Sequence, residues 1–224
     1  RDALNANTTA SNNTAVGYQA LLDNTTGTIN TALGRQALAN NTTGANNTAV
    51  SYSMVTNTTG SSNTAVGYRA LNANTTANNN TAVGTDSLYS NTTGADSTAV
   101  GVSSLLNATT GVRNSAVGYQ AGAYVTTGGD NVLIGYLAGS HDLNLTTGAR
   151  NVLIGAFADT ATAGQTDSVT IGYDVTGTGG YVTLGNGADD IRAANGNVTW
   201  ATVSDERYKK DIVDSTAGLS FINA

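Results

Sequence analysis

The stretch Asn13-Thr14-Ala15-Val16-Gly17 recurs along the chain with a period of 17 residues. Exact or looser copies begin at Asn30, Asn47, Asn63, Asn80, Ser97, Asn114, Asn131 and Asn151, with one step of 16 residues and one of 20. A second phrase, Asn-Thr-Thr-Gly, begins at Asn24 and recurs at the same period, half a repeat later. Self-similarity at a fixed period indicates a stacked repeat architecture. Seventeen residues are too few for a helical pair or a propeller blade, and they suit one coil of a β-solenoid.

The composition excludes several classes of protein. Charged residues make up 11% of the 224-residue chain, which holds 27 Gly, no Pro and no Cys, whereas an average domain is about a quarter charged. The regular spacing of the apolar residues argues against low-complexity disorder. The absence of Cys excludes a disulfide scaffold and a thiolate metal site. The formal charge of −6 argues against a nucleic-acid partner. No apolar run reaches the roughly 18 residues that a membrane span needs, so we expect no membrane insertion. We also expect no cofactor.

Each coil is predicted to contain a strand from Thr14 to Leu21 and a turn at Asn24-Thr25-Thr26-Gly27. Alternation along such a strand would place Val16 on one face and Ala15 on the other, with neither face plainly solvated. Stacking coils about 4.8 Å apart would line up equivalent Asn and Thr side chains as hydrogen-bonded ladders. A short helical turn over the Tyr-Gln-Ala-Leu-Leu segment is the alternative, because its Ala and Leu content permits one.

Two later coils are more apolar than the others. They contain Asn131-Val132-Leu133-Ile134-Gly135 and Asn151-Val152-Leu153-Ile154-Gly155. Both faces of these strands are apolar, so both are expected to be buried. A thin solenoid has only one interior, and a neighbouring copy of the chain is the simplest cover for the second face. The pattern therefore predicts a homo-oligomer.

The repeat pattern divides the chain into three parts. Residues 1–155 are predicted to form the β-solenoid shaft, and residues 156–203 a β-rich neck with hairpins or interchain strands. The composition then switches at Ser204, and residues 204–224 begin with six charges in nine residues. This last part is too short to fold alone. We expect it to open a further domain, which would make the sequence a piece of a longer protein.

The Asn-Thr-Ala-Val-Gly repeats resemble the head repeats of trimeric autotransporter adhesins, which form a parallel β-roll. They are even more similar to the shaft repeats of bacteriophage tail fibres. The resemblance implies an all-β, homotrimeric fibre on the virion, which acts as a rigid spacer in attachment to a host cell-surface receptor, either a polysaccharide or a protein. A bacterial trimeric surface adhesin without self-processing is the alternative that the same resemblance leaves open.

A second motif is sharper. Ser204-Asp205-x-Arg207-x-Lys209-x-x-Ile212 resembles the start of the C-terminal intramolecular chaperone of phage tail fibres and endosialidase tail spikes. In that family the chaperone drives trimer assembly and is then released by self-cleavage. The resemblance implies that the bond between Ser204 and Asp205 is cut, with Ser204 as the nucleophile on its own carbonyl and Lys209 assisting proton transfer. Any enzymatic activity would be this single self-cleavage; no external substrate is expected.

Two other features suggest binding only weakly. His141, the single histidine, lies beside Asp142 in the 20-residue coil, and this pair is too small for a metal site. We therefore expect no metal, although a ring of three His141 side chains on a threefold axis is conceivable. Four tyrosines share one phase of the repeat: Tyr18, Tyr52, Tyr68 and Tyr119. Such a row could grip sugars, but packing between coils or chains is the commoner explanation.

Overall fold

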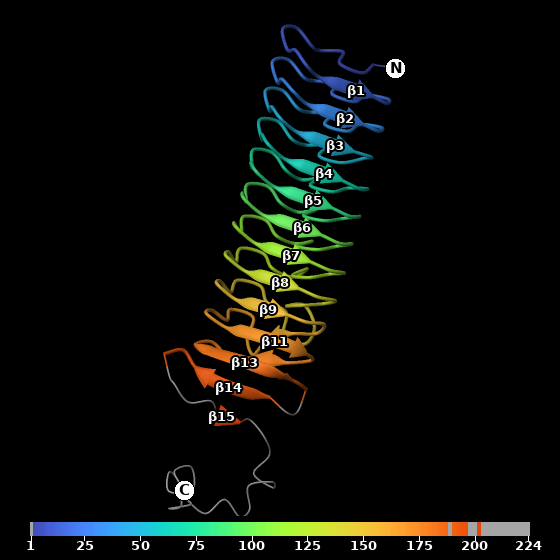
Figure 1. Ribbon diagram of the computed structural model, residues 1–224. Coiled ribbons are helices and arrows are strands. Elements are labelled where there is room, and N and C mark those ends of the chain that lie inside the picture. Colours follow the sequence, from blue (N-terminus) through green and yellow to red (C-terminus); the bar gives the residue numbers. More distant parts are fainter. Residues whose placement is uncertain (1, 188–189, 197–200, 203–224) are drawn as a thin grey trace, which may run out of the picture.

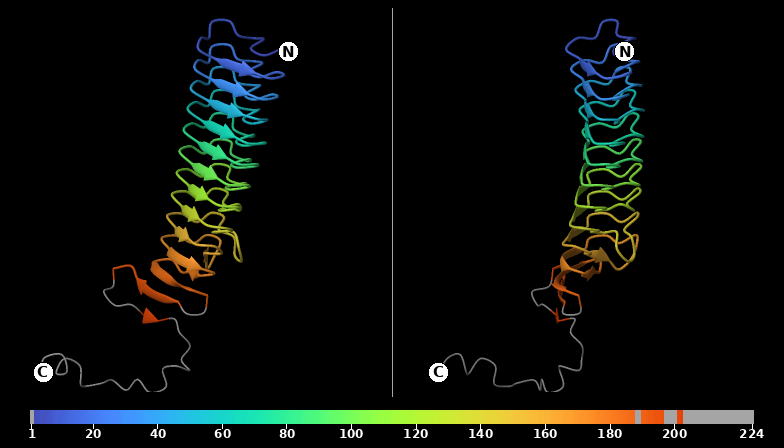
Figure 2. Two further views of the ribbon diagram at one scale, coloured as in Figure 1. Left: turned by 45° about the vertical axis from the view of Figure 1, so that its right-hand side comes forward. Right: turned by 90° about the vertical axis from the view of Figure 1, so that its right-hand side faces the viewer.

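The computed structural model describes residues 2–187, 190–196 and 201–202, and in these parts the chain is an all-β solenoid without a helix. The coils stack one upon another into a slender rod with the N-terminus at one end (Figure 1). Two further views show that the stack is narrow and keeps the same outline over most of its length (Figure 2). The predicted fold class, a β-solenoid with coils of about 17 residues, is confirmed.

Each coil contributes one short strand to a single sheet. The three-residue strands are β1 (Thr14–Val16), β2 (Thr31–Leu33), β3 (Thr48–Val50), β4 (Thr64–Val66), β5 (Thr81–Val83), β6 (Thr98–Val100), β7 (Ser115–Val117), β8 (Val132–Ile134) and β9 (Val152–Ile154). The later strands are β10 (Asp159–Thr160), β11 (Val169–Tyr173), β12 (Thr176–Gly177), β13 (Tyr181–Asn186), β14 (Ile191–Ala194) and β15 (Ala201–Thr202).

Equivalent residues of successive coils pair with one another. From β1 to β9 the strands are parallel neighbours, with Ala15 opposite Ala32 and Leu133 opposite Leu153. The register is kept across both irregular steps, because Ala49 pairs with Ala65 and Leu133 with Leu153. The step of 16 and the step of 20 therefore change the turns and leave the sheet in register.

The interior of the rod is a column of small and medium apolar side chains. The central residue of each strand from β2 to β9 points inward: it is a buried alanine in β2 to β7, such as Ala32 and Ala99, and a buried leucine in β8 and β9. Leucines of the following turn, such as Leu38 and Leu71, are also fully buried and pack in the same cluster. The interior is thin, and in a coil such as the second it is filled by the strand alanine together with an Ala-Leu pair of the following turn, namely Ala32, Ala37 and Leu38.

The segment after each strand differs from both sequence predictions. Strand β1 ends at Val16, and residues 18–23 form consecutive turns that are neither strand nor helix. Gln19 and Leu21 have positive φ angles of 56° and 51°, and the pattern recurs in other coils, as at Gln36 and Leu38. Two left-handed residues close together break the alternation of an extended strand. Ala20 and Leu21 can therefore both point into the interior.

A first row of asparagines ties each coil to the next. The Asn30 backbone N–H donates to Oδ1 of Asn13 at 2.8 Å, and the Asn47 N–H donates to Oδ1 of Asn30 at 2.9 Å. The amide nitrogen of each asparagine also spans the coil, so that Asn30 Nδ2 donates to the Gly44 carbonyl at 2.8 Å. Asn30 and Asn47 are buried, and a buried polar group is tolerated because its hydrogen bonds are made.

A second row of asparagines forms the expected side-chain ladder. Asn41 Nδ2 donates to Asn24 Oδ1 at 2.8 Å, Asn57 to Asn41 at 2.8 Å and Asn74 to Asn57 at 2.7 Å. Each amide also donates to the carbonyl three residues on, as Asn41 does to Gly44 at 2.9 Å. The Gly44 carbonyl thus accepts a hydrogen bond from both rows of asparagines. This shared acceptor links the two sides of the coil.

The second ladder stops part-way along the rod. Asn91 is its last member, and its Oδ1 is buried without a hydrogen-bond partner. Apolar residues take the same place in the following coils, namely Ala108, Val125 and Leu145, all buried. The interior is therefore polar on this side toward the N-terminus and apolar toward the C-terminus.

The stacking continues past residue 155, where the sequence period becomes irregular. Strand β11 pairs in parallel with β9, with Val169 opposite Val152, and β13 pairs in parallel with β11. The direction then reverses, because β14 pairs with β13 and β15 with β14 in antiparallel fashion. The part of residues 156–203 that the structure describes thus continues the parallel stack with β11 and β13 and ends in the antiparallel strands β14 and β15 (Figure 1).

Candidate functional site

The outward face of the sheet is apolar and exposed along the rod. The third residue of each strand points away from the interior, and Val16, Leu33, Val117 and Ile134 are 57%, 48%, 42% and 39% exposed. One such side chain occurs per coil, so they form a continuous row, which we call the outer stripe. Its members are Val16, Leu33, Val50, Val66, Val83, Val100, Val117, Ile134, Ile154 and Ile171.

The outward face becomes more apolar toward the C-terminal end. In the first coils the residue beside the outer stripe is threonine, as at Thr14 and Thr31, whereas in β8, β9 and β11 it is valine. The single chain buries only one face of these strands, as expected for a thin solenoid, and burial of the other face by a neighbouring copy stays a prediction. Leu133 is buried, but Ile134 and Ile171 are each 39% exposed. Nothing in the described part of the chain covers this face.

Aromatic side chains line the outer stripe on one side. Tyr119 stacks on Tyr136 with ring centroids 5.2 Å apart, and Phe157 makes edge contacts with Tyr136 at 5.3 Å and with Tyr173 at 5.6 Å. The tyrosines of this row are about half exposed. The four tyrosines predicted to occupy equivalent positions in their coils also make equivalent backbone hydrogen bonds. In each case the tyrosine carbonyl accepts from an N–H of the next coil, at Tyr18, Tyr52, Tyr68 and Tyr119.

The 20-residue coil carries its extra residues in a loop held by a buried carboxylate. Asp159 is 2% exposed, and its Oδ2 accepts from the N–H groups of His141, Asp142 and Leu143 at 3.3, 2.8 and 3.2 Å. The His141 ring lies against Phe157, with centroids 4.5 Å apart. His141 is thus a packed loop residue here, and no cluster of three metal-ligating side chains occurs among the described residues.

Alternating charges run along another edge of the rod, one per coil: Asp96, Arg113, Asp130, Arg150 and Asp167. The guanidinium of Arg113 binds Asp130 through two hydrogen bonds of 2.6 and 2.9 Å, and Arg150 binds Asp167 in the same way.

These hydrogen bonds hold the pKa of Asp130 and of Asp167 below the usual value. The stabilisation is therefore present above the usual Asp pKa of about 3.9 and is lost as the pH falls through the lowered folded-state pKa. Exposed ion pairs of this kind contribute little to stability.

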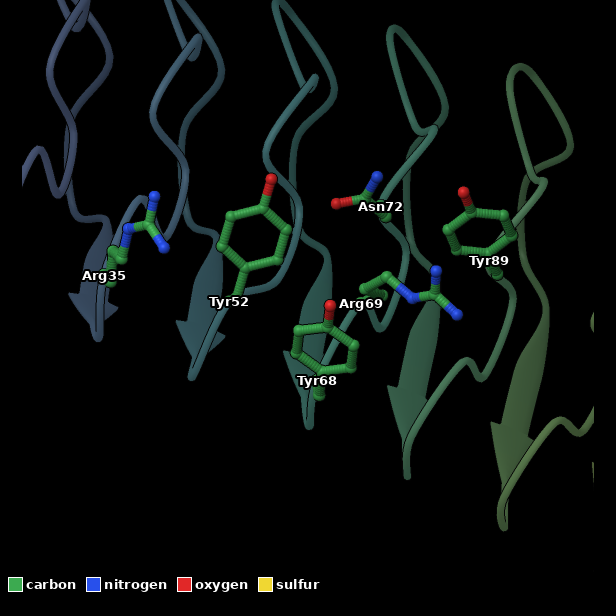
Figure 3. Close-up of a pocket in the computed structure, with 6 residues that line it drawn as sticks. All are labelled: Arg35, Tyr52, Tyr68, Arg69, Asn72 and Tyr89. Carbon is green, nitrogen blue, oxygen red and sulfur yellow. The ribbon is translucent and has the colours of Figure 1, made fainter.

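A hollow of about 400 Å³ lies beside the third coil. Its walls are Arg35, Tyr52, Tyr68, Arg69, Asn72 and Tyr89 (Figure 3). Arg69 binds Asp86 through two hydrogen bonds of 2.7 and 2.9 Å, and its guanidinium carbon lies 4.7 Å from the centre of the Tyr89 ring. The row of tyrosines was predicted from the sequence, but Arg35, Arg69 and Tyr89 were not. The step of 16 residues between Asn47 and Asn63 is the signal that could have located the hollow.

The residues assigned to self-cleavage, Ser204, Asp205 and Lys209, lie outside the described residues. Comparison with protein-family models, with curated proteins and with solved structures gave no match. No helix in the described ranges is long and apolar enough to cross a membrane.

Proposed function

We propose that this chain is the shaft of a homotrimeric bacteriophage tail fibre that takes part in attachment to the host surface. Its C-terminal end would begin an intramolecular chaperone that directs trimerisation and is released by cleavage between Ser204 and Asp205. The observation that carries the proposal is the outer stripe, an apolar row that runs the length of the rod and has no cover in the described chain.

The energetics of the outer stripe favour association. Fully burying a Val or Ile side chain contributes roughly 1.5–3 kcal/mol, and seven of the ten stripe side chains are 36–57% exposed in the single chain. Each coil therefore adds a fraction of that value when the stripe is covered. The gain is repeated along the whole rod, so even a small contribution per coil sums to a stable interface.

A second copy of the chain is the partner that fits this surface best. The stripe presents one side chain per coil at a spacing of about 4.8 Å. A parallel copy has the same spacing, the same change from Thr to Val beside the stripe, and the same position for the Val- and Ile-rich end. The proposed number of three copies comes from the resemblance to trimeric fibres and adhesins. The outer stripe by itself requires at least two copies.

The proposed place of the chain in attachment follows from its shape and surface. A narrow rod of ladder-linked coils is suited to hold two parts of a virion apart at a fixed distance (Figure 2). The exposed positions of the turns are largely Thr, Asn and Ser, as at Thr26, Asn46 and Ser62, which gives a hydrated surface of low charge. The receptor that the fibre contacts on the host cell would be a polysaccharide or a protein.

The test is the molar mass of the protein when it is expressed with the complete chaperone domain that this proposal places after Ser204. On denaturing analysis we expect a shortened product that ends at Ser204, since hydrolysis of the Ser204–Asp205 bond consumes one water and leaves a new carboxylate and a new amine. Under native conditions, sedimentation of that product should give three copies.

The variant Ser204→Ala should leave the chain full length, because it removes the proposed nucleophile. Ser215→Ala is the matched control and should be cleaved like the unaltered protein. An intact chain in all three proteins would contradict self-cleavage, and a sedimenting monomer would contradict the shaft.

A further inference from the structure

We propose that the hollow beside the third coil binds an acidic sugar, a pyranose ring that carries a carboxylate. The proposal concerns a binding activity in addition to the shaft, and it does not depend on how many copies assemble. It is carried by the origin of the hollow, its aromatic walls and its unpaired arginine.

The hollow exists because the third coil lacks one residue. Leu21 N donates to the Ala37 carbonyl in the second coil, and Leu38 N donates to the Ser53 carbonyl in the third. Ser53 thus takes the place of Ala37, and Tyr52 the place of Arg35, which leaves no counterpart of Gln36 between them. In neighbouring coils this place holds a polar side chain, namely Gln19, Gln36, Arg69 and Asp86. The missing side chain opens the surface between Gln36 and Arg69.

Aromatic rings form one wall of the hollow. Tyr52 and Tyr68 lie with centroids 5.8 Å apart and their planes inclined by 30°. Figure 3 shows both rings broadly face-on and side by side along the row of coils. This differs from Tyr119 and Tyr136, whose planes are only 13° apart at 5.2 Å, so that each covers the other. The Arg69 guanidinium lies over the Tyr68 ring, so Tyr52 supplies the ring face on which the C–H groups of a sugar ring would pack.

The charges around the hollow favour a carboxylate. Arg69 is neutralised by Asp86 and held against Tyr68 and Tyr89, with its guanidinium carbon 5.2 and 4.7 Å from the ring centres. Arg35 is exposed and forms no ion pair within the described ranges. A guanidinium with free donors binds a carboxylate through charge-assisted hydrogen bonds. Since the whole chain carries a formal charge of −6, attraction of an anion to this place is local to Arg35.

The size and the remaining polar groups fit a small ligand with hydroxyl groups. The volume of about 400 Å³ lies within the roughly 300–1,000 Å³ that is usual for ligand sites. Asn72 lies in the wall between Tyr52 and Tyr89 in Figure 3, and its Oδ1 has no hydrogen-bond partner. A sugar hydroxyl could donate to this amide after a rotation of the side chain, which would satisfy an acceptor that the folded chain leaves unpaired.

The experiment is a ligand-observed NMR titration of the 224-residue chain with glucuronic acid and, separately, with glucose at low ionic strength. We expect saturable binding, with glucuronic acid at least about tenfold tighter than glucose because only the acid gains a charge-assisted bond to Arg35. Arg35→Gln should bring the two affinities to within about twofold of each other. Tyr52→Ala should weaken both by about tenfold, because the stacking surface is lost.

Two further variants make the test specific to the hollow. Insertion of one glutamine between Tyr52 and Ser53 restores the 17-residue coil and should abolish binding of both sugars. Tyr119→Ala, at the same phase of the repeat but outside the hollow, should leave both affinities unchanged. Thermal unfolding checks that each variant folds; if Tyr52→Ala does not, the exposed Arg35→Gln substitution decides.

The proposal is overturned if neither sugar binds saturably, if both bind equally well to the unaltered chain, or if the insertion variant binds as tightly as the unaltered chain. An equal loss in Tyr119→Ala and Tyr52→Ala would also overturn it. A negative result here would leave the molar mass of the assembly unaffected, so failure of this proposal is distinguishable from failure of the shaft.

Discussion

Replacing Asn57 by alanine is expected to lower the free energy of unfolding by about 3–5 kcal/mol. The side chain stands in the middle of the second asparagine ladder. It donates to Asn41 Oδ1 and to the Gly60 carbonyl, and it accepts from Asn74 Nδ2 at 2.7 Å. The substitution removes three hydrogen bonds and leaves Asn41 Oδ1 buried without a donor, which costs more than the bonds themselves. The measurement is thermal or denaturant unfolding followed by circular dichroism.

Asn91→Ala is the matched control, because Asn91 ends the same ladder. Its amide donates to Asn74 and to Gly94, but its Oδ1 has no partner to lose. The substitution also leaves Asn74 Oδ1 without a donor, but it breaks one hydrogen bond fewer and removes an acceptor that is already unsatisfied, so we expect a loss about 1–2 kcal/mol smaller than for Asn57→Ala. If Asn57→Ala destabilised the protein no more than Asn91→Ala, the ladder would not be a source of stability.

Replacing Gly101 by alanine is expected to lower the free energy of unfolding by about 3 kcal/mol or more. Gly101 has a φ of +136°, and a Cβ there would lie inside the contact distance of the Gly118 carbonyl oxygen in the next coil. The backbone conformation alone costs a side chain about 1–3 kcal/mol, and the overlap forces the two coils apart. A loss of this size lowers Tm by roughly 6–12 °C in a chain of this length.

Gly180→Ala separates the two contributions. Gly180 also has a positive φ, of +76°, but a Cβ there would meet nothing within 4 Å. It should therefore cost only the roughly 1–2 kcal/mol of a left-handed residue. Equal Tm values for the two variants would mean that the close approach of the coils at Gly101 does not limit stability.

The sequence was sufficient to predict the fold but not the path of the chain within a coil. The period predicted stacked parallel strands, and Asn and Thr ladders were expected from side chains repeated at one phase. The strand was predicted to run to Leu21 because residues 14–21 can alternate. It ends at Val16 because Gln19 and Leu21 adopt positive φ angles, a conformation unusual for leucine that the tertiary packing imposes.

The candidate surfaces were predictable only in part. The apolar strands at Val132–Ile134 and Val152–Ile154 correctly indicated a face that the chain cannot bury alone, since Ile134 remains exposed. The buried Asp159 and the hollow beside Tyr52 depend on how an inserted or missing residue is accommodated. Such changes break the period, and a repeat pattern gives no information about the structure of its own exceptions.

Cross-linking through one introduced cysteine tests most directly that the outer stripe meets the same stripe of a sister chain. The chain contains no Cys, so Val117→Cys provides a single thiol on the stripe, and Thr127→Cys provides one on an exposed turn. Under mild oxidation at low micromolar concentration, Val117→Cys should form covalent dimers rapidly, because parallel copies in register bring equivalent residues together. Thr127→Cys should remain monomeric on a denaturing gel. Cross-linking of Val117→Cys no faster than that of Thr127→Cys would show that the stripe is not an interface, and would contradict the account.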